Sequence, residues 1–595
     1  MIKKWVIVFV MAAMAAMLVW AGNGFALTTT WTGGTDTDWA TAGNWGAGVP
    51  GAGDTAIIPF VASLPTVPAG GGTCLNLQIN TTGGVVTITL AGNLTIPNGG
   101  SITVTAGGNA SNITGGGSLV QGGTDIITNN STGLFTISCF QITNTGASLT
   151  TFAGTGNTTV TAAIIEGSGT PITKSGAGTL ALNGANTFIG ALTINTGTVE
   201  LGHISAFGSG AGGITMTGGI LKVTVAGGIN AGNWTPLVNL TGNAAIEFAA
   251  AGTTIDTAIS VGNGFVLTIQ GNSAATFTGG IIGAGGVTIN MAANQVIAIT
   301  SAAWAYTGDT TLQSGFITTN AAGLLTSSGT YLLSNNANAK ITTAGVLENI
   351  GSLSGGGAAG GNIVLGGAMT INQTTNTTYS GIISGSGVLR KIGAGTLKLA
   401  GVNTYIGATN VDAGILLVNA SQSVAGAFTI SNANTTLGGT GNLGNNAVTI
   451  AVGAIVKPGD GGVGTLTTTG PFTFQAGSKL IVDIVNATKD LLAVNTLNVA
   501  ATSIIQLEPG YIWASGSDPY QVVTATTYDS SGGNVFTTSS FPAFWSITST
   551  TNSDIKINGG APGIPTLTEW GLILFALFIA AFAIWSIRRK NYKAA

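Results

Sequence analysis

Few residues of this chain could carry out nucleophilic or acid–base chemistry. Its 595 residues include one histidine, His203, in the segment Leu201-Gly202-His203-Ile204. A Ser-His-Asp triad would have to use His203 as its base, and no Gly-x-Ser-x-Gly elbow is present to hold the serine. We therefore expect His203 to lie in a solvated turn, and we predict no catalytic residue.

Two further patterns match ligand sites only in part. Residues 459–464 read Gly-Asp-Gly-Gly-Val-Gly, which fits the spacing of a dinucleotide-binding turn. That turn must open a helix, whereas Thr465-Leu466-Thr467-Thr468 predicts a strand. Asp36 and Asp38 would share one face of a strand and are conceivable calcium ligands. No EF-hand loop surrounds them, so we interpret them as turn-forming acids and predict no metal and no cofactor.

The two cysteines leave their redox state open. Cys74 and Cys139 do not have the spacing of a metal motif. An exported chain can oxidise such a pair to a disulfide. Two buried free thiols are the alternative, which is the interpretation that we prefer.

The composition excludes several classes of protein. Charged residues make up 6% of the chain against about 25% in an average protein. Glycine contributes 96 residues, and 44% of the chain is hydrophobic, which favours strands and turns over helices. Arg390 is the one arginine outside the C-terminal tail, so no basic stripe for nucleic acid exists. The 19 acids form no cluster such as a polysaccharide-degrading β-helix uses, so an enzyme is the least favoured class.

The N-terminal residues 1–26 predict a signal peptide. Lys3 and Lys4 precede an unbroken apolar run, and Gly24-Phe25-Ala26 places small residues at the two positions that signal peptidase reads. We expect cleavage after Ala26. An N-terminal membrane anchor that is never cut is the alternative.

The C-terminal residues predict a membrane helix with a defined orientation. A linker and motif at 559–571 precede an apolar segment at 572–587, and a basic tail follows at 588–595. A helix from Trp570 to residue 587 would be roughly 27 Å long, close to the about 30 Å of a bilayer core. The basic stop places the tail in the cytoplasm; it consists of Arg588, Arg589 and Lys590.

The motif before this helix resembles a known sorting signal. Its six fixed residues are Ile564, Pro565, Thr566, Leu567, Trp570 and Gly571. Pro565 keeps the segment extended, as a protease groove requires. The motif, helix and basic cluster together resemble the IPTL-CTERM sorting signal of Gram-negative bacteria. The resemblance implies that an exosortase cuts the chain near the motif, after transient anchoring in the inner membrane. A plain anchor without processing is the alternative.

The body of the chain contains an internal repeat. Residues 174–201 and 391–418 align without gaps and share 14 identities, and a weaker copy covers 304–317. Thr179–Leu182, Leu192–Ile194 and Thr198–Leu201 predict three strands per repeat, with Leu180, Leu182 and Phe188 facing inward. We interpret each 28-residue repeat as one coil of a stack, because a single coil cannot bury its own apolar face.

This repeat resembles the passenger-associated repeat of autotransporters over 167–201 and 375–418, and residues 453–470 are similar to a late passenger segment. The resemblance implies an all-β fold, a right-handed parallel β-helix displayed on bacteria. The chain ends in a helix and a basic tail where an autotransporter has its barrel. We divide the chain into 1–26, signal peptide; 27–165, β-rich cap and first coils; 166–430, solenoid with repeats; 431–558, C-terminal solenoid; 559–571, linker and motif; 572–587, transmembrane helix; and 588–595, basic tail.

Three tryptophans mark the start of the body. Trp31, Trp39 and Trp45 precede the regular repeats. A solenoid needs a cap that hides its first coil, and we prefer this role for the tryptophans. A carbohydrate-stacking platform would use the same residues.

We conclude from the sequence that the protein is exported across the inner membrane, anchored by its C-terminus and then displayed on the cell surface or released. Its expected function is structural or adhesive, with signal peptidase, exosortase and the inner membrane as partners in transit. A glycan-binding module that contacts surface glycans or other cells is the alternative. A polysaccharide-degrading β-helix is a third possibility.

Overall fold

The computed structural model describes residues 26–559, 576–582 and 584, apart from internal gaps. The gaps are 145–148, 167–168, 170, 209–211, 227–236, 326–328, 346, 423–425, 487, 509–511, 514–519, 530–535, 540, 542–544 and 551–553. The chain divides into two compact units. Unit 1 comprises Met1–Gly351 and Ala359–Asn362, and unit 2 comprises Ser352–Ala358 and Ile363–Ala595.

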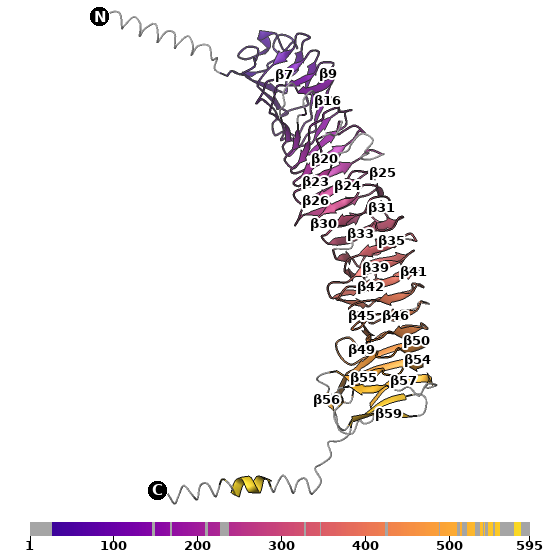
Figure 1. Ribbon diagram of the computed structural model, residues 1–595. Helices are drawn as coiled ribbons and strands as arrows, with labels where there is room; N and C mark the ends of the chain where they lie inside the picture. The colour runs from indigo at the N-terminus through magenta and orange to yellow at the C-terminus, as the bar shows by residue number, and fades with distance from the viewer. Residues whose placement is uncertain are drawn as a thin grey trace, which may run out of the picture. The chain divides into compact units, whose positions relative to one another are not determined.

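Unit 1 is a parallel β-solenoid, as the ribbon shows (Figure 1). One face is a 13-stranded parallel sheet, which we call sheet A, and successive register partners in it lie 20 to 27 residues apart. Its strands are β1 (Thr28–Thr30), β2 (Thr55–Pro59), β5 (Asn76–Asn80), β8 (Ser101–Val104), β11 (Asp125–Asn129), β14 (Thr150–Ala153), β17 (Ile172–Lys174), β19 (Leu192–Ile194), β21 (Ile214–Met216), β23 (Val238–Leu240), β26 (Ile259–Val261), β29 (Ile281–Gly283) and β32 (Ala305–Tyr306).

Three further parallel sheets complete the coils of unit 1. Sheet C contains β3 (Thr66–Val67), β6 (Val86–Leu90), β9 (Ser111–Gly115), β12 (Phe135–Cys139), β15 (Thr158–Val160), β18 (Thr179–Leu182), β20 (Thr198–Leu201), β22 (Ile220–Val223), β24 (Ala244–Phe248), β27 (Val266–Gly271), β30 (Gly286–Met291), β33 (Thr310–Thr319) and β34 (Tyr331–Leu333). Sheet D contains β4 (Gly72–Thr73), β7 (Leu94–Ile96), β10 (Leu119–Gln121), β13 (Gln141–Asn144) and β16 (Ala163–Glu166). Sheet E contains β25 (Thr253–Ile255), β28 (Ala275–Phe277), β31 (Val296–Ile299), part of β33, and β35 (Ala339–Thr343); β36 (Glu348–Ile350) ends the unit.

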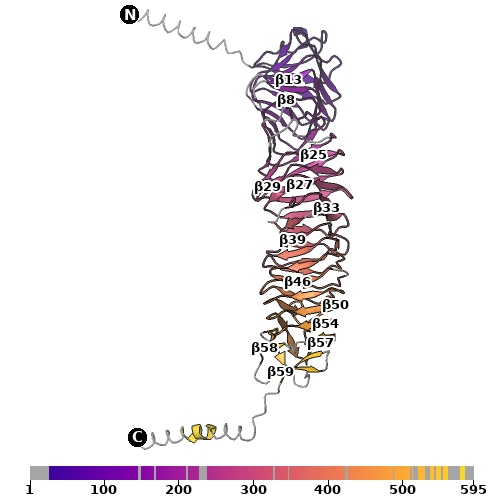
Figure 2. The same cartoon turned by 45° about the vertical axis from the view of Figure 1, so that its right-hand side comes forward.

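Unit 2 repeats this architecture and closes with antiparallel strands, seen near the β57 and β59 labels after rotation (Figure 2). Its sheet F contains β39 (Met369–Asn372), β42 (Leu389–Ile392), β44 (Thr409–Val411), β46 (Phe428–Ile430), β48 (Val448–Ile450), β50 (Thr465–Phe474), β54 (Leu491–Val499), β57 (Tyr520–Asp529), β60 (Asp554–Gly559) and β59 (Trp545–Thr550). The opposite strands are β37 (Leu353–Gly355), β40 (Thr377–Tyr379), β43 (Thr396–Leu399), β45 (Ile415–Val418), β47 (Thr436–Gly439), β49 (Ile455–Pro458), β51 (Lys479–Val482), β55 (Ile504–Leu507) and β58 (Thr537–Ser539). The remaining strands are β38 (Asn362–Leu365), β41 (Ile383–Gly385), β52 (Ile484–Asn486), β53 (Thr488–Lys489) and β56 (Ile512–Trp513).

The core of each unit is a column of stacked apolar side chains. Leu180 and Leu182 of β18 lie in register with Val199 and Leu201 of β20, and all four are at most 2% exposed. Burying such a side chain stabilises the fold by about 1.5–3 kcal/mol relative to leaving it in water. The expected inward position of Phe188 is confirmed, since it is 1% exposed.

The alternate side chains of sheet A point outward and keep the surface uncharged. Its central file is in register from strand to strand: Thr28, Thr55, Asn76, Ser101, Ile126, Thr151, Thr173, Thr193, Thr215, Asn239, Ser260, Ile282 and Ala305. Side-chain hydrogen bonds link neighbouring coils, as where Ser101 Oγ donates to Asn76 Oδ1 at 2.8 Å. Short polar side chains therefore occupy most of the outward face of sheet A, and this face needs few charged residues.

The prediction that each 28-residue repeat forms one coil is wrong. The three predicted strands occur at the expected residues, as β18, β19 and β20. However, β18 pairs in register with β20, so both belong to the same face of adjacent coils. The 28-residue repeat therefore spans parts of two coils. The segment between β18 and β19 forms an irregular corner and not a strand.

A different corner, between β19 and β20 and between β44 and β45, uses glycine where no other residue fits. Gly197 and Gly414 occupy equivalent positions of the two repeats and have φ of +73° and +68°. A Cβ on Gly414 would lie 2.5 Å from the carbonyl oxygen of Gly393. Both the left-handed backbone and the close approach of the previous coil require glycine here.

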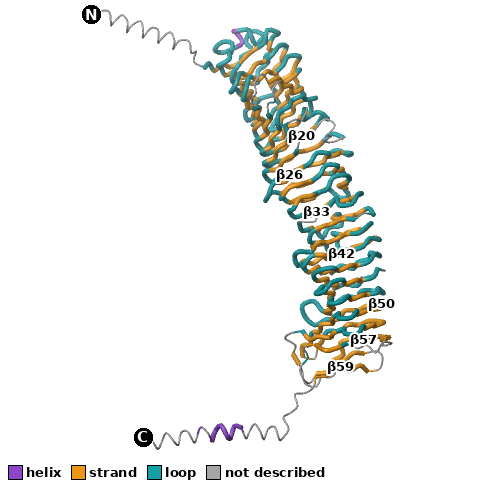
Figure 3. Tube along the Cα trace, in the orientation of Figure 1, coloured by secondary structure: helices purple, strands orange, loops and turns teal. Residues whose placement is uncertain are grey.

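Helix is confined to two short segments of the described residues (Figure 3). One is the 3-10 helix η1 (Ala42–Asn44), and the other covers 576–582. Within the part of the chain that the structure describes, no helix has the length and apolarity needed to cross a membrane.

Candidate functional site

The predicted processing residues lie almost wholly outside the described residues. This holds for all six residues of the sorting motif (Ile564, Pro565, Thr566, Leu567, Trp570 and Gly571) and for the basic stop (Arg588, Arg589 and Lys590). Ala26, the expected cleavage residue, is the first described residue. The geometry available for a site therefore comes from the body of the chain.

The N-terminal tryptophans pack against one another inside the cap. Trp45 lies between the other two, with ring centroids 5.1 Å from Trp31 and 4.7 Å from Trp39 in edge-to-face arrangements. Their exposed fractions are 0% for Trp31, 1% for Trp39 and 5% for Trp45. Burial of this kind is what we expect of a cap, and rings this deeply buried offer no face on which a sugar could stack.

Two buried lysines donate to main-chain carbonyls at one corner of the repeats, and the contact of Lys391 with Ala413 also reaches the next coil. Lys391 Nζ donates to the carbonyl oxygens of Gly393 at 2.9 Å and Ala413 at 2.7 Å. Lys174, at the equivalent position, donates to Ser175 O and Gly176 O at 2.8 and 2.6 Å. Both side chains are at most 3% exposed, and burial lowers the pKa of each to about 8. The repeat lysine is thus a structural residue.

A buried asparagine at the next corner of each repeat bonds to the main chain of the neighbouring coil. Asn186 Oδ1 accepts the Ile164 amide at 2.8 Å, and Asn403 Oδ1 accepts the Ile383 amide at the same distance. Each side chain therefore satisfies a main-chain donor of the preceding coil. Sequence reasoning missed both the lysine and the asparagine, although their recurrence in the two repeats was the available signal.

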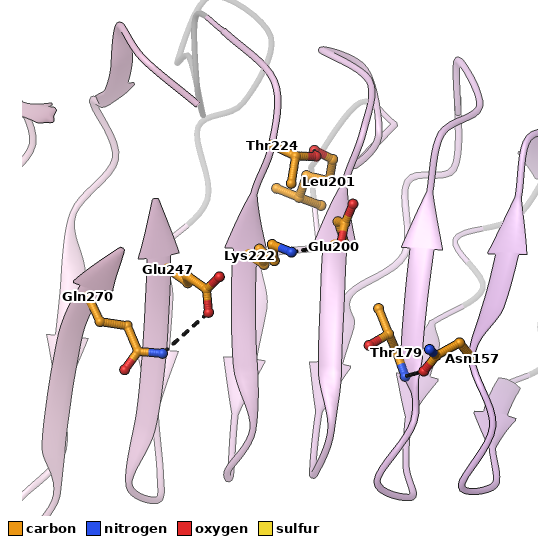
Figure 4. A network of polar contacts seen from close by, with 8 residues as sticks. All are labelled: Asn157, Thr179, Glu200, Leu201, Lys222, Thr224, Glu247 and Gln270. Atoms are coloured by element: carbon orange, nitrogen blue, oxygen red, sulfur yellow. Dashed lines mark hydrogen bonds and ion pairs between the residues drawn. The ribbon is translucent and has the colours of Figure 1, made fainter. Parts of the chain in front are cut away.

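The outward face of sheet C carries charges, in contrast to sheet A (Figure 4). Glu200, Lys222, Glu247 and Gln270 follow one another in register on successive strands. Lys222 Nζ lies 3.2 Å from Glu200 Oε2, and Gln270 Nε2 donates to Glu247 Oε2 at 3.4 Å. These contacts are only half-buried at the surface of the sheet, so each contributes about 0–1 kcal/mol.

The residues that resembled catalytic or metal sites stabilise turns. His203 Nδ1 accepts the Ser205 amide at 3.0 Å, as expected for a turn histidine. Asp36 Oδ1 accepts the Asp38 amide, and Asp38 Oδ1 accepts the Ala40 amide, both at 2.8 Å. The hydrogen bond that Asp36 accepts from the Asn44 side chain lowers the pKa of Asp36. Among the described residues, no group of three or more acidic, histidine or cysteine side chains is placed to hold a metal.

The glycine-rich loop at 459–464 joins strand β49 to strand β50, so the helix that a dinucleotide site needs is replaced by a strand. Asp490 holds the end of this loop, since its Oδ1 accepts the Gly464 amide at 2.8 Å. Burial raises the pKa of Asp490 to about 7. Asp460 within the loop forms an ion pair with Lys398, and the loop is a solenoid corner as expected.

Cys74 and Cys139 are both free and buried, so the preferred interpretation of two free thiols is confirmed. Burial raises the pKa of Cys74 to about 12 and also raises that of Cys139. Thiols with raised pKa values in apolar surroundings are poor nucleophiles.

Comparisons with known proteins match three family models. The passenger-associated-transport-repeat matches 172–201 and 389–418, and the IPTL-CTERM motif matches 562–589. A domain of unknown function, DUF8693, matches 30–145, the region of the cap and first coils. The chain therefore carries both the passenger repeats and the C-terminal motif that its sequence suggested.

Two curated proteins are similar over part of their length. The "Adhesin BmaC autotransporter" of Brucella suis biovar 1 (strain 1330) is 31% identical over 180 residues, which is 27% of this chain and 5% of that protein. The "Extracellular serine protease" of Serratia marcescens is 39% identical over 139 residues, 22% of this chain and 13% of that protein. The chain thus spans a small fraction of each relative, and their activities do not transfer with the match.

Proposed function

We propose that this protein is an exported β-solenoid of the bacterial surface, with a structural or adhesive role and no enzymatic activity. A signal peptide cut after Ala26 would direct it through the inner membrane, and an exosortase would process its C-terminus. The observation that carries the proposal is the presence in one chain of passenger repeats and an IPTL-CTERM motif. We also propose the right-handed coil, which is the usual hand of parallel crossover connections.

We propose the transient anchor from the apolar segment at 572–587. The helix described at 576–582 is by itself too short to cross a membrane. Leu577 and Phe578 are 63% and 76% exposed, so the described parts of the chain do not cover them. Apolar side chains of this size are stable in a bilayer core. The chain would remain in the inner membrane until the sorting motif is cut.

The similarity to a serine protease does not favour catalysis in this chain. The one histidine in the sequence is His203, and its Nδ1 accepts a main-chain amide. In a triad the corresponding nitrogen must donate to a carboxylate. The protease match covers 139 residues, which is 13% of that protein, so its activity does not follow from the match.

The termini of the mature protein test this proposal. Mass spectrometry of the chain expressed in a bacterium with an exosortase should find residue 27 at the N-terminus and a C-terminus between Ile564 and Trp570. Pro565→Ala should leave the tail intact and the chain in the membrane fraction, because the extended motif is lost. Thr568→Ala, at a variable position of the motif, is the matched control and should be processed. An intact tail in the wild type would support a plain anchor instead.

A further inference from the structure

The cap of unit 1 covers two edges of the first coil. At sheet A, Thr30 O accepts the Gly46 amide at 2.9 Å. At sheet C, Thr66 bonds to Thr37 O at 2.6 Å and to the Trp39 amide at 2.9 Å. Such covering is how solenoids keep a free strand edge from pairing with another chain.

The edge of sheet D is not covered in this way. Its end strand is β4, which pairs with β7 alone, near the label of β7 (Figure 1). The amides of Gly72 and Cys74 donate to Asn93 O and Thr95 O, at 2.9 and 3.2 Å. In a parallel ladder the intervening residue presents its main-chain groups to the other side. Thr73 therefore faces away from β7, and no described residue is paired with it across that edge.

A cavity of about 520 Å³ lies beside this open edge. It is lined by Trp39, Ala40, Val49, Pro50, Gly51, Ala52, Gly70, Gly71, Gly72, Thr73, Asn93 and Thr95. None of these residues is charged, and three consecutive glycines leave the main chain of the edge strand accessible to a ligand. The cavity suits an uncharged guest of a few residues.

One hydrogen-bond donor at the cavity is left unpaired within the part of the chain that the structure describes. Trp31 Nε1 donates to Ser63 O at 2.6 Å, and Trp45 Nε1 donates to Trp39 O at 2.7 Å. Trp39 is 1% exposed, and its Nε1 has no acceptor among the described residues. This nitrogen would lie 3.0 Å from a Cβ on Gly72, so the indole edge faces the open strand. An unmade buried hydrogen bond costs about 1–3 kcal/mol, which a guest carbonyl would recover.

We propose that this cavity is a docking site for an extended, uncharged peptide of a partner protein, which adds a strand to the open edge of β4. A peptide matches the site because its alternating N–H and C=O groups complement those of a strand edge. Its uncharged side chains match the uncharged lining. The proposal does not depend on how the chain is exported or sorted.

A defined strand-forming peptide tests the site. The probe is an acetylated, amidated peptide with the sequence of residues 116–123, which contains strand β10 of the same sheet, titrated into the purified chain by calorimetry. We expect saturable binding, and at least tenfold weaker binding of the same peptide with proline in place of its valine. Absence of binding, or equal binding of the two peptides, would overturn the proposal.

Cavity-filling variants locate the binding. Gly70→Trp should abolish it, since a Cβ there meets nothing within 4 Å and the new side chain can enter the cavity without strain. Gly108→Trp is the matched control, because a Cβ there is equally unobstructed but lies outside the lining. Binding that survives Gly70→Trp would place the peptide elsewhere and contradict the inference.

The indole donor gives a second measurement. Trp39→Phe keeps a ring in the cap but removes the unpaired N–H, so binding should weaken about tenfold. The smaller ring leaves a void beside Trp45, so the thermal unfolding midpoint should fall, and binding is measured well below that midpoint. In the wild type labelled with 15N-tryptophan, the peptide should shift the Trp39 indole signal. A saturable response to cellohexaose instead, lost in Gly70→Trp, would assign the cavity to a sugar and refute the peptide.

Discussion

At the scale of single residues, the repeats depend on a buried cation that has main-chain carbonyls as its partners. Lys174 and Lys391 stand at the same repeat position, and each donates to two carbonyl oxygens. Burial is the cause that lowers their pKa values to about 8. The charged form is thus less favourable in the folded chain than in the unfolded chain.

This pKa difference predicts that stability rises with pH between about 8 and about 10.4. In that window the unfolded chain, with an ordinary lysine pKa near 10.4, binds more protons than the folded chain, so raising the pH favours folding. Below about 8 both states are protonated and the cost of burying the charge is fully present. The upper bound is about 3 kcal/mol per lysine, at about 1.4 kcal/mol per pKa unit. Urea unfolding at pH 7.5 and 9.5 measures the change.

The double variant Lys174→Met, Lys391→Met is the control for other titrating groups. Methionine has similar length and no charge, so the gain in stability between the two pH values should shrink markedly. An unchanged gain would show that the buried lysines are not its source.

The two cysteines give a second prediction at this scale. Because both thiols are buried, neither should react with Ellman's reagent in the folded chain, and both should react after unfolding in guanidinium without reductant. Mass spectrometry of the exported chain should find two free thiols. A single disulfide-linked species would contradict the structure.

At the scale of elements, the corners of the coils follow a pairing rule. Tyr405 hydroxyl and Thr409 Oγ1 lie 2.5 Å apart, and both side chains are buried. Tyr306 and Thr310 form the same contact in the weaker third copy. The first repeat has Phe188 and Leu192 at these positions, both buried. The hydrogen-bonded Tyr–Thr pair of one repeat is thus replaced by an apolar Phe–Leu pair in the other.

This rule predicts a compensating pair of substitutions. Thr409→Val should cost about 1–3 kcal/mol, since it leaves the buried Tyr405 hydroxyl without its partner. Adding Tyr405→Phe removes the unpaired group, so the double variant should be more stable than Thr409→Val alone. Denaturant unfolding of the four proteins of the cycle gives the coupling energy. A double variant no more stable than the single one would refute the rule.

The strands were predictable from sequence, but their assignment to coils was not. Alternation in Thr179–Leu182 and Thr198–Leu201 placed β18 and β20 correctly, because period two determines which side chains face the core. Sequence spacing does not reveal which strands are neighbours across a coil. The segment that follows β18 in the coil is irregular. Counting three strands per coil therefore overestimated the number of residues in one coil.

At the scale of the whole molecule, the sequence was most informative where function depends on local motifs. The passenger repeats and the C-terminal motif were recognisable as linear patterns, and the family matches confirm both. The burial of the three tryptophans agrees with the preferred cap role, which stays a prediction. The cavity beside β4 could not be predicted, because it is formed by segments around residues 39, 50, 71 and 94 that only the stacking brings together.

The coils of unit 1 stack in register, so that each coil adds one strand spacing. Spin labels on sheet A of unit 1 test this directly, in a background of Cys74→Ala and Cys139→Ala. Ser101 and Thr215 are five register steps apart, and Ser101 and Ser260 are seven. At about 4.8 Å per step, electron–electron double resonance should give distances between the labels of about 24 Å and about 34 Å. Two distances that do not increase with the number of coils would contradict the solenoid.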